Sequence, residues 1–168
     1  DKKIFKNIDQ RFAKHYRWVE FNKEDLLTTE ELEKYKYDWP RFAATIGLME
    51  LYYGNKNLKV LELGGKGVST KFLKAYFPKW EIENYCEDLR QKNWKIPDNE
   101  YDLIISMEVI EHLSDVNETN FEWNASFLST GLLNCLEESK RIIKKDGGRI
   151  FITTPNALSL INFYKMTM

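Results

Sequence analysis

The spacing of hydrophobic positions changes near residue 58 of this 168-residue chain. Before that point apolar residues recur every three or four positions, which is typical of amphipathic helices. Thr28 and Glu31 have the spacing of a helix capping box, and Pro40 begins a helix that Gly54 can end. We predict that residues 1–57 are helical and that four apolar residues spaced four apart lie on one stripe of the first helix: Ile4, Ile8, Phe12 and Tyr16.

Short apolar runs alternate with helical patterns after this change. The runs predict strands, and the amphipathic stretches between them predict helices. Strands separated by helices need crossover connections, which produce a parallel sheet. We therefore predict an α/β domain over residues 58–168, with a Rossmann-like, doubly wound, mostly parallel sheet and helices on both faces. The predicted strands are residues 58–63, 81–86, 101–107 and 149–154, and the predicted helices are residues 69–77 and 127–145.

Composition narrows the possible partners. With 25 basic and 26 acidic residues the net charge is −1, so extended nucleic-acid binding is not expected. No apolar run approaches the roughly 20 residues that a membrane-spanning helix needs. Cys86 and Cys135 are the only cysteines, and they form no metal-binding spacing or disulfide framework. We expect a cytoplasmic protein that acts on a small molecule, while the sequence does not indicate an oligomeric state.

The segment "VLELGGKGVST", residues 60–70, places three glycines where a predicted strand passes into a helix. Bare backbone amides at a helix N-terminus can hold a nucleotide-like ligand. Glu87 and Asp88 follow Gly67 by 20 and 21 positions. At this distance an acid that ends the next strand can accept hydrogen bonds from ribose hydroxyls. The combination indicates an adenosine-type ligand, although a tight turn and a solvated acid produce the same pattern.

Two further segments, "IPDNEYDLIISMEVIEHLSD" and "ESKRIIKKDGGRIFITTPN", follow "VLELGGKG" along the chain. In order and spacing the three segments resemble the nucleotide-binding half of class I S-adenosylmethionine-dependent methyltransferases. The resemblance is greatest to the type 11/12-like group, which has an "EVIEHL"-type segment after the fourth strand of the family fold. The resemblance covers roughly residues 58–158. It implies a cofactor-binding core over residues 58–168 and a helical lid over residues 1–57.

The resemblance also implies the cofactor site. The acid that ends the first strand and the glycines after it would hold the methionine part of S-adenosylmethionine. Either Glu87 or Asp88 would hold the ribose, and Met107 ends a further strand beside the cofactor. In the lid Trp39 and Arg41 are candidate substrate residues, as are Thr154 and Asn156 of "TTPN" after the last predicted strand. The residues expected at the methionine part are Glu62, Gly64, Gly65 and Gly67.

The chain departs from the family pattern in three places. Either Lys66 stands where family members usually have a middle glycine, or the turn has lost one residue. The segment from Cys86 to Asp102 is too short for the helix and strand that the family inserts there, so we expect a trimmed adenine pocket. The chain also ends shortly after the fifth strand of a seven-stranded family sheet, so we expect the C-terminal strands to be missing and Ile150 and Ile152 to be exposed.

Glu108, Glu111 and His112 are the candidate catalytic residues. On a helix after the strand they would share one face through three- and four-residue spacing. Three interpretations stay open. The group could bind a divalent metal, His112 could act as a general base, or the charges could only orient the rim of the site. We do not expect a metal, because a metal site would need a further ligand.

We predict a methyltransferase that transfers a methyl group from S-adenosylmethionine to a small polar acceptor, at oxygen. One alternative is a metal-dependent RNA 3′-end 2′-O-methyltransferase that uses the Glu108, Glu111 and His112 group. Another is a degenerate methyltransferase fold that binds a partner protein without cofactor. A nicotinamide dehydrogenase shares the glycine turn but accounts less well for "EVIEHL" and "TTPN".

Overall fold

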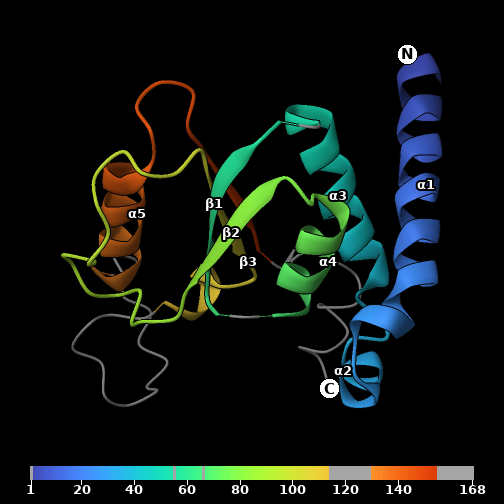
Figure 1. Ribbon diagram of the computed structural model, residues 1–168, viewed down its shortest axis with the longest axis horizontal. Coiled ribbons are helices and arrows are strands. Elements are labelled where there is room, and N and C mark those ends of the chain that lie inside the picture. Colours follow the sequence, from blue (N-terminus) through green and yellow to red (C-terminus); the bar gives the residue numbers. More distant parts are fainter. Residues whose placement is uncertain (1, 55, 66, 114–129, 155–168) are drawn as a thin grey trace, which may run out of the picture. The chain divides into compact units, whose positions relative to one another are not determined.

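The computed structural model describes residues 2–54, 56–65, 67–113 and 130–154, and the side chains of residues 2–11 lie outside this description. The described helices include none that is both long enough and apolar enough to cross a bilayer. Five α-helices and one short 3-10 helix are described (Figure 1): α1 (Lys2–Leu26), α2 (Thr29–Lys34), α3 (Trp39–Tyr53), α4 (Val68–Tyr76), η1 (Ile110–His112) and α5 (Thr130–Ile142). The strands are β1 (Leu58–Leu63), β2 (Trp80–Tyr85), β3 (Leu103–Met107) and β4 (Arg149–Thr153).

The chain divides into two compact units. Residues 1–58 and 66–82 form the first unit, and residues 59–65 and 83–168 form the second. The first unit therefore adds α4 and the start of β2 to the N-terminal helices. The domain boundary that we predict between residues 57 and 58 remains a prediction.

The four strands form one sheet in the order β2-β1-β3-β4. β1 and β3 are parallel with Val60 opposite Leu103, and β3 and β4 are parallel with Leu103 opposite Arg149. The chain leaves β1 toward one side to form β2 and returns to the other side to form β3. This reversal is a topological switch point, and ligands of such sheets bind there at the carboxyl ends of the strands. The predicted Rossmann-like, mostly parallel α/β fold is confirmed.

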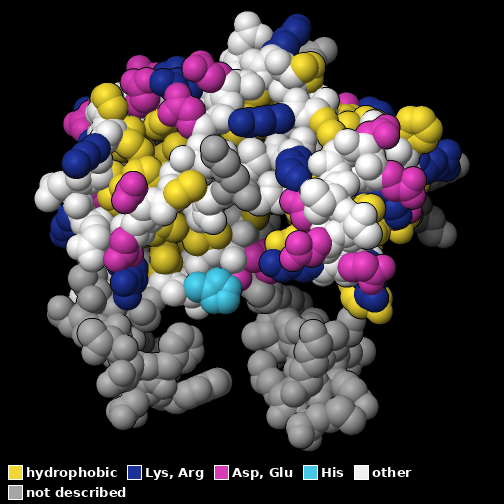
Figure 2. All heavy atoms as spheres, turned by 60° about the horizontal axis from the view of Figure 1, so that its bottom comes forward, with side chains coloured by type: hydrophobic (Ala, Val, Ile, Leu, Met, Phe, Trp, Pro, Cys, Tyr) yellow, Lys and Arg dark blue, Asp and Glu magenta, His cyan; other side chains and the backbone are white. Residues whose placement is uncertain are grey.

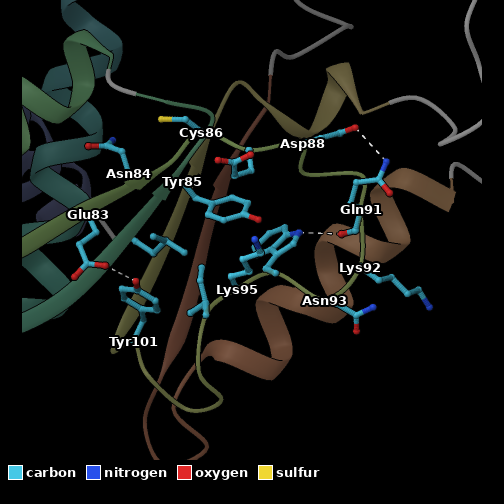
Figure 3. Close-up of a pocket in the computed structure, with 14 residues that line it drawn as sticks. Glu83, Asn84, Tyr85, Cys86, Asp88, Gln91, Lys92, Asn93, Lys95 and Tyr101 are labelled. Carbon is cyan, nitrogen blue, oxygen red and sulfur yellow. Dashed lines mark hydrogen bonds between the residues drawn. The ribbon is translucent and has the colours of Figure 1, made fainter.

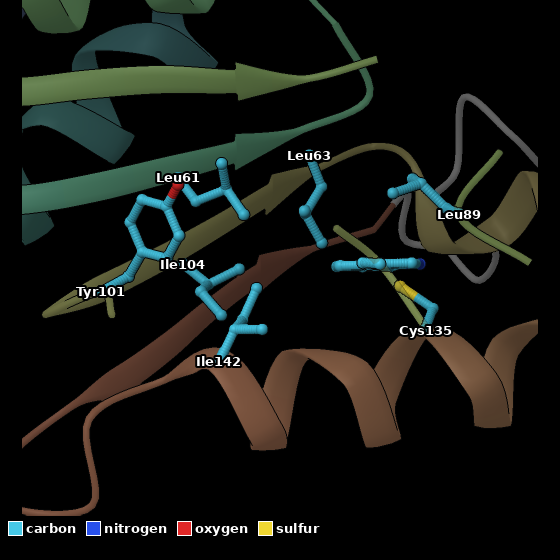
Figure 4. Packing of buried hydrophobic residues seen from close by; sticks show 8 residues of the cluster. Leu61, Leu63, Leu89, Tyr101, Ile104, Cys135 and Ile142 are labelled. Atoms are coloured by element: carbon cyan, nitrogen blue, oxygen red, sulfur yellow. The ribbon is translucent and has the colours of Figure 1, made fainter. Parts of the chain in front are cut away.

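A hydrophobic core joins the sheet of the second unit to α5 (Figure 4). Leu61, Leu63 and Ile104 come from β1 and β3, and Cys135 and Ile142 come from α5. Residues 60–63 of β1 and 103–106 of β3 are all buried, so neither strand shows the alternation of buried and exposed positions that a half-exposed strand has. Burial of the Cys135 thiol raises its pKa to about 11. Cys135 is therefore a packing residue.

Helix ends in the first unit follow the predicted caps. The Thr28 hydroxyl accepts the Glu31 N–H at 3.3 Å, and the Glu31 carboxylate accepts the Thr28 N–H at 2.8 Å. Pro40 lies in the first turn of α3, and Gly54 ends that helix with a φ of +54°. The capping box at Thr28 and the ends of α3 are confirmed. Between the helices, Phe72 of α4 packs against the rings of Trp39 and Phe42 at centroid distances of 6.3 and 5.4 Å.

Phe12 and Tyr16 lie side by side on α1 as predicted, with ring centroids 6.0 Å apart, but this stripe is not the most buried one of the helix. Phe12 is 40% exposed and Tyr16 is half-buried, whereas His15 and Val19 are fully buried. A four-residue step advances about 40° beyond a full helical turn, so a run of such steps winds away from one face. The side chains of Ile4 and Ile8 lie outside the described residues.

His15 is buried because a polar cluster receives it. Its Nε2 lies 2.8 Å from Oε2 of Glu50 in α3. The same carboxylate accepts hydrogen bonds from Lys14 Nζ at 2.9 Å and from the Tyr76 hydroxyl at 2.8 Å. Burial works to raise the pKa of Glu50, but the hydrogen bonds from Lys14, Tyr76 and His15 outweigh it and lower that pKa to about 2. The cluster ties α1, α3 and α4 together.

The connection between β2 and β3 contains no helix or strand from residue 86 to residue 100. The prediction that this segment is too short for either is confirmed. The other edge of the sheet is β4, where Ile150 and Ile152 are each 38% exposed, as expected. The prediction of missing strands after β4 concerns residues outside the described part of the chain.

Candidate functional site

The turn after β1 lies at the switch point of the sheet. Gly64 and Gly65 have φ values of +95° and +97°, which side chains rarely adopt. The Gly64 N–H donates to the Tyr85 carbonyl at 3.2 Å. A Cβ on Gly64 would lie 2.6 Å from Val109 Cγ2, so packing within the protein already requires glycine there. A Cβ on Gly65 would make only an ordinary van der Waals contact with Cys86 Sγ at 3.8 Å, so steric overlap does not require glycine there.

Glu62 is the acid near the end of β1, and it is only 3% exposed. Asn84 Nδ2 donates to Glu62 Oε2 at 3.2 Å and to the Gly65 carbonyl at 3.1 Å. Asn84 thus links a buried carboxylate to the glycine turn. Sequence reasoning missed Asn84, and the only signal was a polar residue near the end of the second strand pattern.

The two acids after β2 differ in their surroundings. Glu87 is exposed. Asp88 accepts hydrogen bonds from Arg90 Nε at 2.9 Å and Arg90 Nη2 at 3.0 Å, and from the Arg90 backbone N–H at 3.0 Å. Gln91 Nε2 donates to the same carboxylate at 3.2 Å. The Arg90 side chain is the main reason why the pKa of Asp88 lies well below its usual range. Asp88 is an anion that a ligand hydroxyl would have to share with Arg90.

The predicted helix over Glu108, Glu111 and His112 is wrong. Glu108 has a φ of +54° and donates its N–H to the Thr153 carbonyl at 3.0 Å. Its backbone therefore extends the pairing between β3 and β4 by one hydrogen bond. Only Ile110–His112 are helical, as the short helix η1. Glu111 Oε1 lies 3.9 Å from His112 Nε2. Across residues 2–54, 56–65, 67–113 and 130–154, no group of three His, Cys, Asp or Glu side chains could hold a metal ion.

His112 lies at the surface, with 76% of its side chain exposed. Figure 2 shows a histidine side chain exposed on the face drawn there, whereas His15 is fully buried. The role of His112 as a general base stays a prediction. Met107, the last residue of β3, is half-buried, and its role beside the cofactor also stays a prediction.

A pocket of about 600 Å³ lies in the second unit, along β2 and the segment that follows it. Figure 3 shows Tyr85 pointing into it, while Asn84 points to the opposite face of β2. The Tyr85 ring stacks on Trp94 at a centroid distance of 4.6 Å. Burial and the nearby Glu87 raise the pKa of Tyr85, so its hydroxyl stays protonated. The lining comprises Leu61, Glu83, Asn84, Tyr85, Cys86, Glu87, Asp88, Gln91, Lys92, Asn93, Trp94, Lys95, Ile96 and Tyr101.

Three predicted site residues belong to the first unit. Gly67 is the N-cap of α4, and its N–H donates to the Thr70 hydroxyl at 3.3 Å. Trp39 is 5% exposed within the aromatic core, and Arg41 Nη2 pairs with Asp38 at 3.2 Å. The described contacts of Trp39 are those of a packing residue.

The remaining predicted residues lie near the end of β4 or outside the description. Thr154 directly follows β4 and is exposed, and Asn156 lies outside the described residues, as does Lys66. The second unit therefore brings together Glu62, Gly64, Gly65, Glu87 and Asp88 around the carboxyl ends of β1 and β2.

Comparisons with known proteins add little to this geometry. No protein-family model matches the chain, and no curated protein matches it. One solved structure, described as "Crystal structure of trans-methyltransferase CalH complex with SAH", aligns with 94% of this chain and 56% of its own length. The identity is 12% and the TM-score is 0.45. The chain thus spans little more than half of that protein, and a similarity at this level assigns neither a family nor an activity.

Proposed function

We propose that the chain is an S-adenosylmethionine-dependent methyltransferase that methylates a small polar acceptor at oxygen. The observation that carries the proposal is the buried Glu62 carboxylate, which Asn84 links to a glycine turn at the switch point of a Rossmann-like sheet. The resemblance of "VLELGGKG", "EVIEHL" and "TTPN" to class I methyltransferases supports the same function. The net charge of −1 favours a small acceptor over a nucleic acid.

The residues around the turn fit the proposed cofactor. Gly64 and Gly65 have no side chains, so their backbone could be approached closely by a ligand, as in the glycine turns of nucleotide-binding sheets. Glu62 would accept a hydrogen bond from the cofactor's ammonium group, and Glu87 or Asp88 would accept the ribose hydroxyls. When bound, S-adenosylmethionine would supply a methyl group on a sulfonium, which is electrophilic without help from a metal. The protein's contribution would then be mostly to align the acceptor oxygen with that methyl.

One observation favours the alternative of a cofactor-free scaffold. Arg90 already occupies both carboxylate oxygens of Asp88. A ribose at Asp88 would have to share or displace these bonds, so this pair could mark a site that has lost its ligand. Binding of the cofactor by the purified chain decides between the two functions.

The test is calorimetric titration of the chain with S-adenosylmethionine and S-adenosylhomocysteine. We expect saturable binding in the micromolar range. Glu87→Gln and Asp88→Asn identify the ribose acid, because losing a hydrogen bond to a charged group costs roughly 1.5–3 kcal/mol, or about ten- to a hundredfold in Kd. Glu81→Gln is the matched control, because Glu81 is an exposed acid on β2 outside the pocket lining. No binding by the wild-type chain would reject the enzyme and favour the scaffold.

Methyl transfer is tested next with a panel of small hydroxyl-containing acceptors, with and without Mg²⁺ or Mn²⁺. We expect a methylated product that is independent of added metal. If His112 is the general base, His112→Ala lowers kcat and leaves the Kd for S-adenosylhomocysteine unchanged. Activity that requires both a metal and an RNA end would replace the small-molecule function with the RNA-end alternative.

A further inference from the structure

The segment between β2 and β3 holds a fixed position without any helix or strand. A long connection without secondary structure is uncommon in a compact domain and is usually functional or disordered. Here Leu89 and Trp94 are only 6% and 4% exposed and belong to the core of the second unit. Residues 91–96 of this connection, which we call the pocket wall, all line the pocket described above. Something other than secondary structure must therefore fix the pocket wall.

Glu138 of α5 holds the backbone of the pocket wall. Its side chain is 9% exposed, and its Oε2 accepts the Trp94 N–H at 3.0 Å. It also accepts a hydrogen bond from the Asn93 backbone. Asn93 has a φ of +62°, a left-handed conformation that asparagine tolerates and that lets successive N–H groups converge on one anion. Burial works to raise the pKa of Glu138, but the hydrogen bonds from Arg141 and from these two backbone amides outweigh it and lower that pKa.

Arg141 completes the attachment from the next turn of α5. Its guanidinium donates to Glu138 Oε2 at 2.6 Å, to the Trp94 carbonyl at 3.0 Å and to the Ile96 carbonyl at 2.8 Å. It also donates to Asp98 Oδ1 at 2.6 Å. The guanidinium has several donors in a fixed planar geometry, so one side chain can hold several acceptors that a lysine could not reach together.

A third contact lies on the same stripe of α5. Asn134 Nδ2 donates to the Arg90 carbonyl at 2.9 Å, just before the pocket wall. Asn134, Glu138 and Arg141 are spaced four and three residues apart, so they share one face of the helix. Figure 3 shows Gln91, Lys92 and Asn93 of the pocket wall beside this helix. Hydrogen bonds from one face of α5 thus position the connection between β2 and β3, which has no helix or strand of its own.

We infer that Glu138 and Arg141 are positioning residues that shape the pocket by clamping residues 91–96 to α5. One consequence rests on the proposed function: the clamp sets the affinity of the pocket for the adenosine end of the cofactor. Neither residue touches the ligand. Both act through Trp94, whose ring supports Tyr85 inside the pocket, and through the backbone that carries Gln91 and Asn93.

The test compares Glu138→Gln and Arg141→Lys with the wild-type chain in two measurements. Glu81→Gln is the matched control, because it makes the same chemical change at an exposed acid on β2 that lies outside the pocket lining. The first measurement is native-state hydrogen–deuterium exchange. We expect the amides of the pocket wall to exchange about tenfold faster in both clamp variants, while those of β1 and β3 keep their wild-type rates.

The second measurement is the calorimetric Kd for S-adenosylhomocysteine. We expect binding to weaken about tenfold in both clamp variants and to stay within about twofold of wild type in Glu81→Gln. Unchanged exchange in the pocket wall would overturn the clamp. Faster exchange with unchanged Kd would overturn its role in binding.

Failure of the proposed function would look different. In that case the wild-type chain itself would not bind S-adenosylhomocysteine, and the role in cofactor affinity would be rejected together with the function. The exchange measurement would still decide whether α5 clamps the pocket wall. A general loss of folding in one variant would appear as faster exchange in β1 and β3, and the clamp is then judged on the more conservative Arg141→Lys.

Discussion

Replacing Gly64 and Gly65 one at a time by alanine separates backbone strain from steric overlap. The two residues have nearly the same φ, +95° and +97°, so both substitutions force a side chain into a left-handed conformation. That cost is about 1–2 kcal/mol. Only the Gly64 Cβ would also overlap a neighbour, at 2.6 Å from Val109 Cγ2. Overpacking of this kind costs about 1–3 kcal/mol more.

We therefore expect Gly65→Ala to lower the free energy of unfolding by about 1–2 kcal/mol and Gly64→Ala to lower it by about 2–5 kcal/mol. Urea unfolding followed by circular dichroism measures both values. The same two substitutions in a Val109→Ala background form a double-mutant cycle. Removing the valine methyl groups should recover about 1–3 kcal/mol for Gly64→Ala and nothing for Gly65→Ala.

Two results would refute this reasoning. Equal costs for the two alanine variants would mean that Val109 is not close to the turn. A Gly64→Ala cost that persists in the Val109→Ala background would mean that strain, not overlap, sets it. The pair also separates stability from binding, because Gly65→Ala adds a methyl group to the proposed cofactor turn without steric overlap. It should weaken cofactor binding under conditions where the protein stays folded.

Three further predictions concern other parts of the chain. The folded-state pKa of Glu50 is lowered to about 2, so the stabilisation by its carboxylate is complete above about pH 4.5 and is lost as the pH falls toward 2. The difference in the free energy of urea unfolding between pH 6 and pH 3 should be about 1–2 kcal/mol smaller in Glu50→Gln than in the wild type, a range reduced for the 35% exposure of the side chain. An unchanged pH profile would contradict this prediction. Gly148→Ala should lower the free energy of unfolding by about 1–3 kcal/mol, because its Cβ would lie 2.3 Å from the Lys144 carbonyl oxygen. Thermal unfolding measures the effect, and a melting temperature equal to that of the wild type would rule out this close packing. A thiol reagent should modify the exposed Cys86 quickly and the buried Cys135, whose pKa is raised to about 11, only on unfolding; two equally fast thiols would argue against the burial of Cys135.

Local periodicity was sufficient to predict most helices and strands. Residues 58–63 were predicted as a strand and form β1, and the capping box at Thr28 begins α2 as expected. These features depend on residues within one or two turns of each other, so the sequence contains all the information that determines them. The shortness of the segment between β2 and β3 also followed from counting residues.

The errors arose where distant residues decide the local conformation. Residues 108–112 read as a helix by spacing, but Glu108 is bound through its backbone to Thr153, which is 45 residues away in sequence. The burial of His15 on α1 was likewise not predicted, because its partner, Glu50, belongs to another helix. Neither partner can be inferred from the local pattern.

Among the candidate site residues, the sequence by itself located the glycine turn and the acids at the strand ends, because their chemistry follows from the order of strand, turn and helix. It did not reveal Asn84, Glu138 or Arg141. Their roles depend on hydrogen bonds across 22, 44 and 47 residues, to Glu62 and to Trp94. Such partners meet only after the sheet and α5 have packed together, so tertiary structure was needed to identify them.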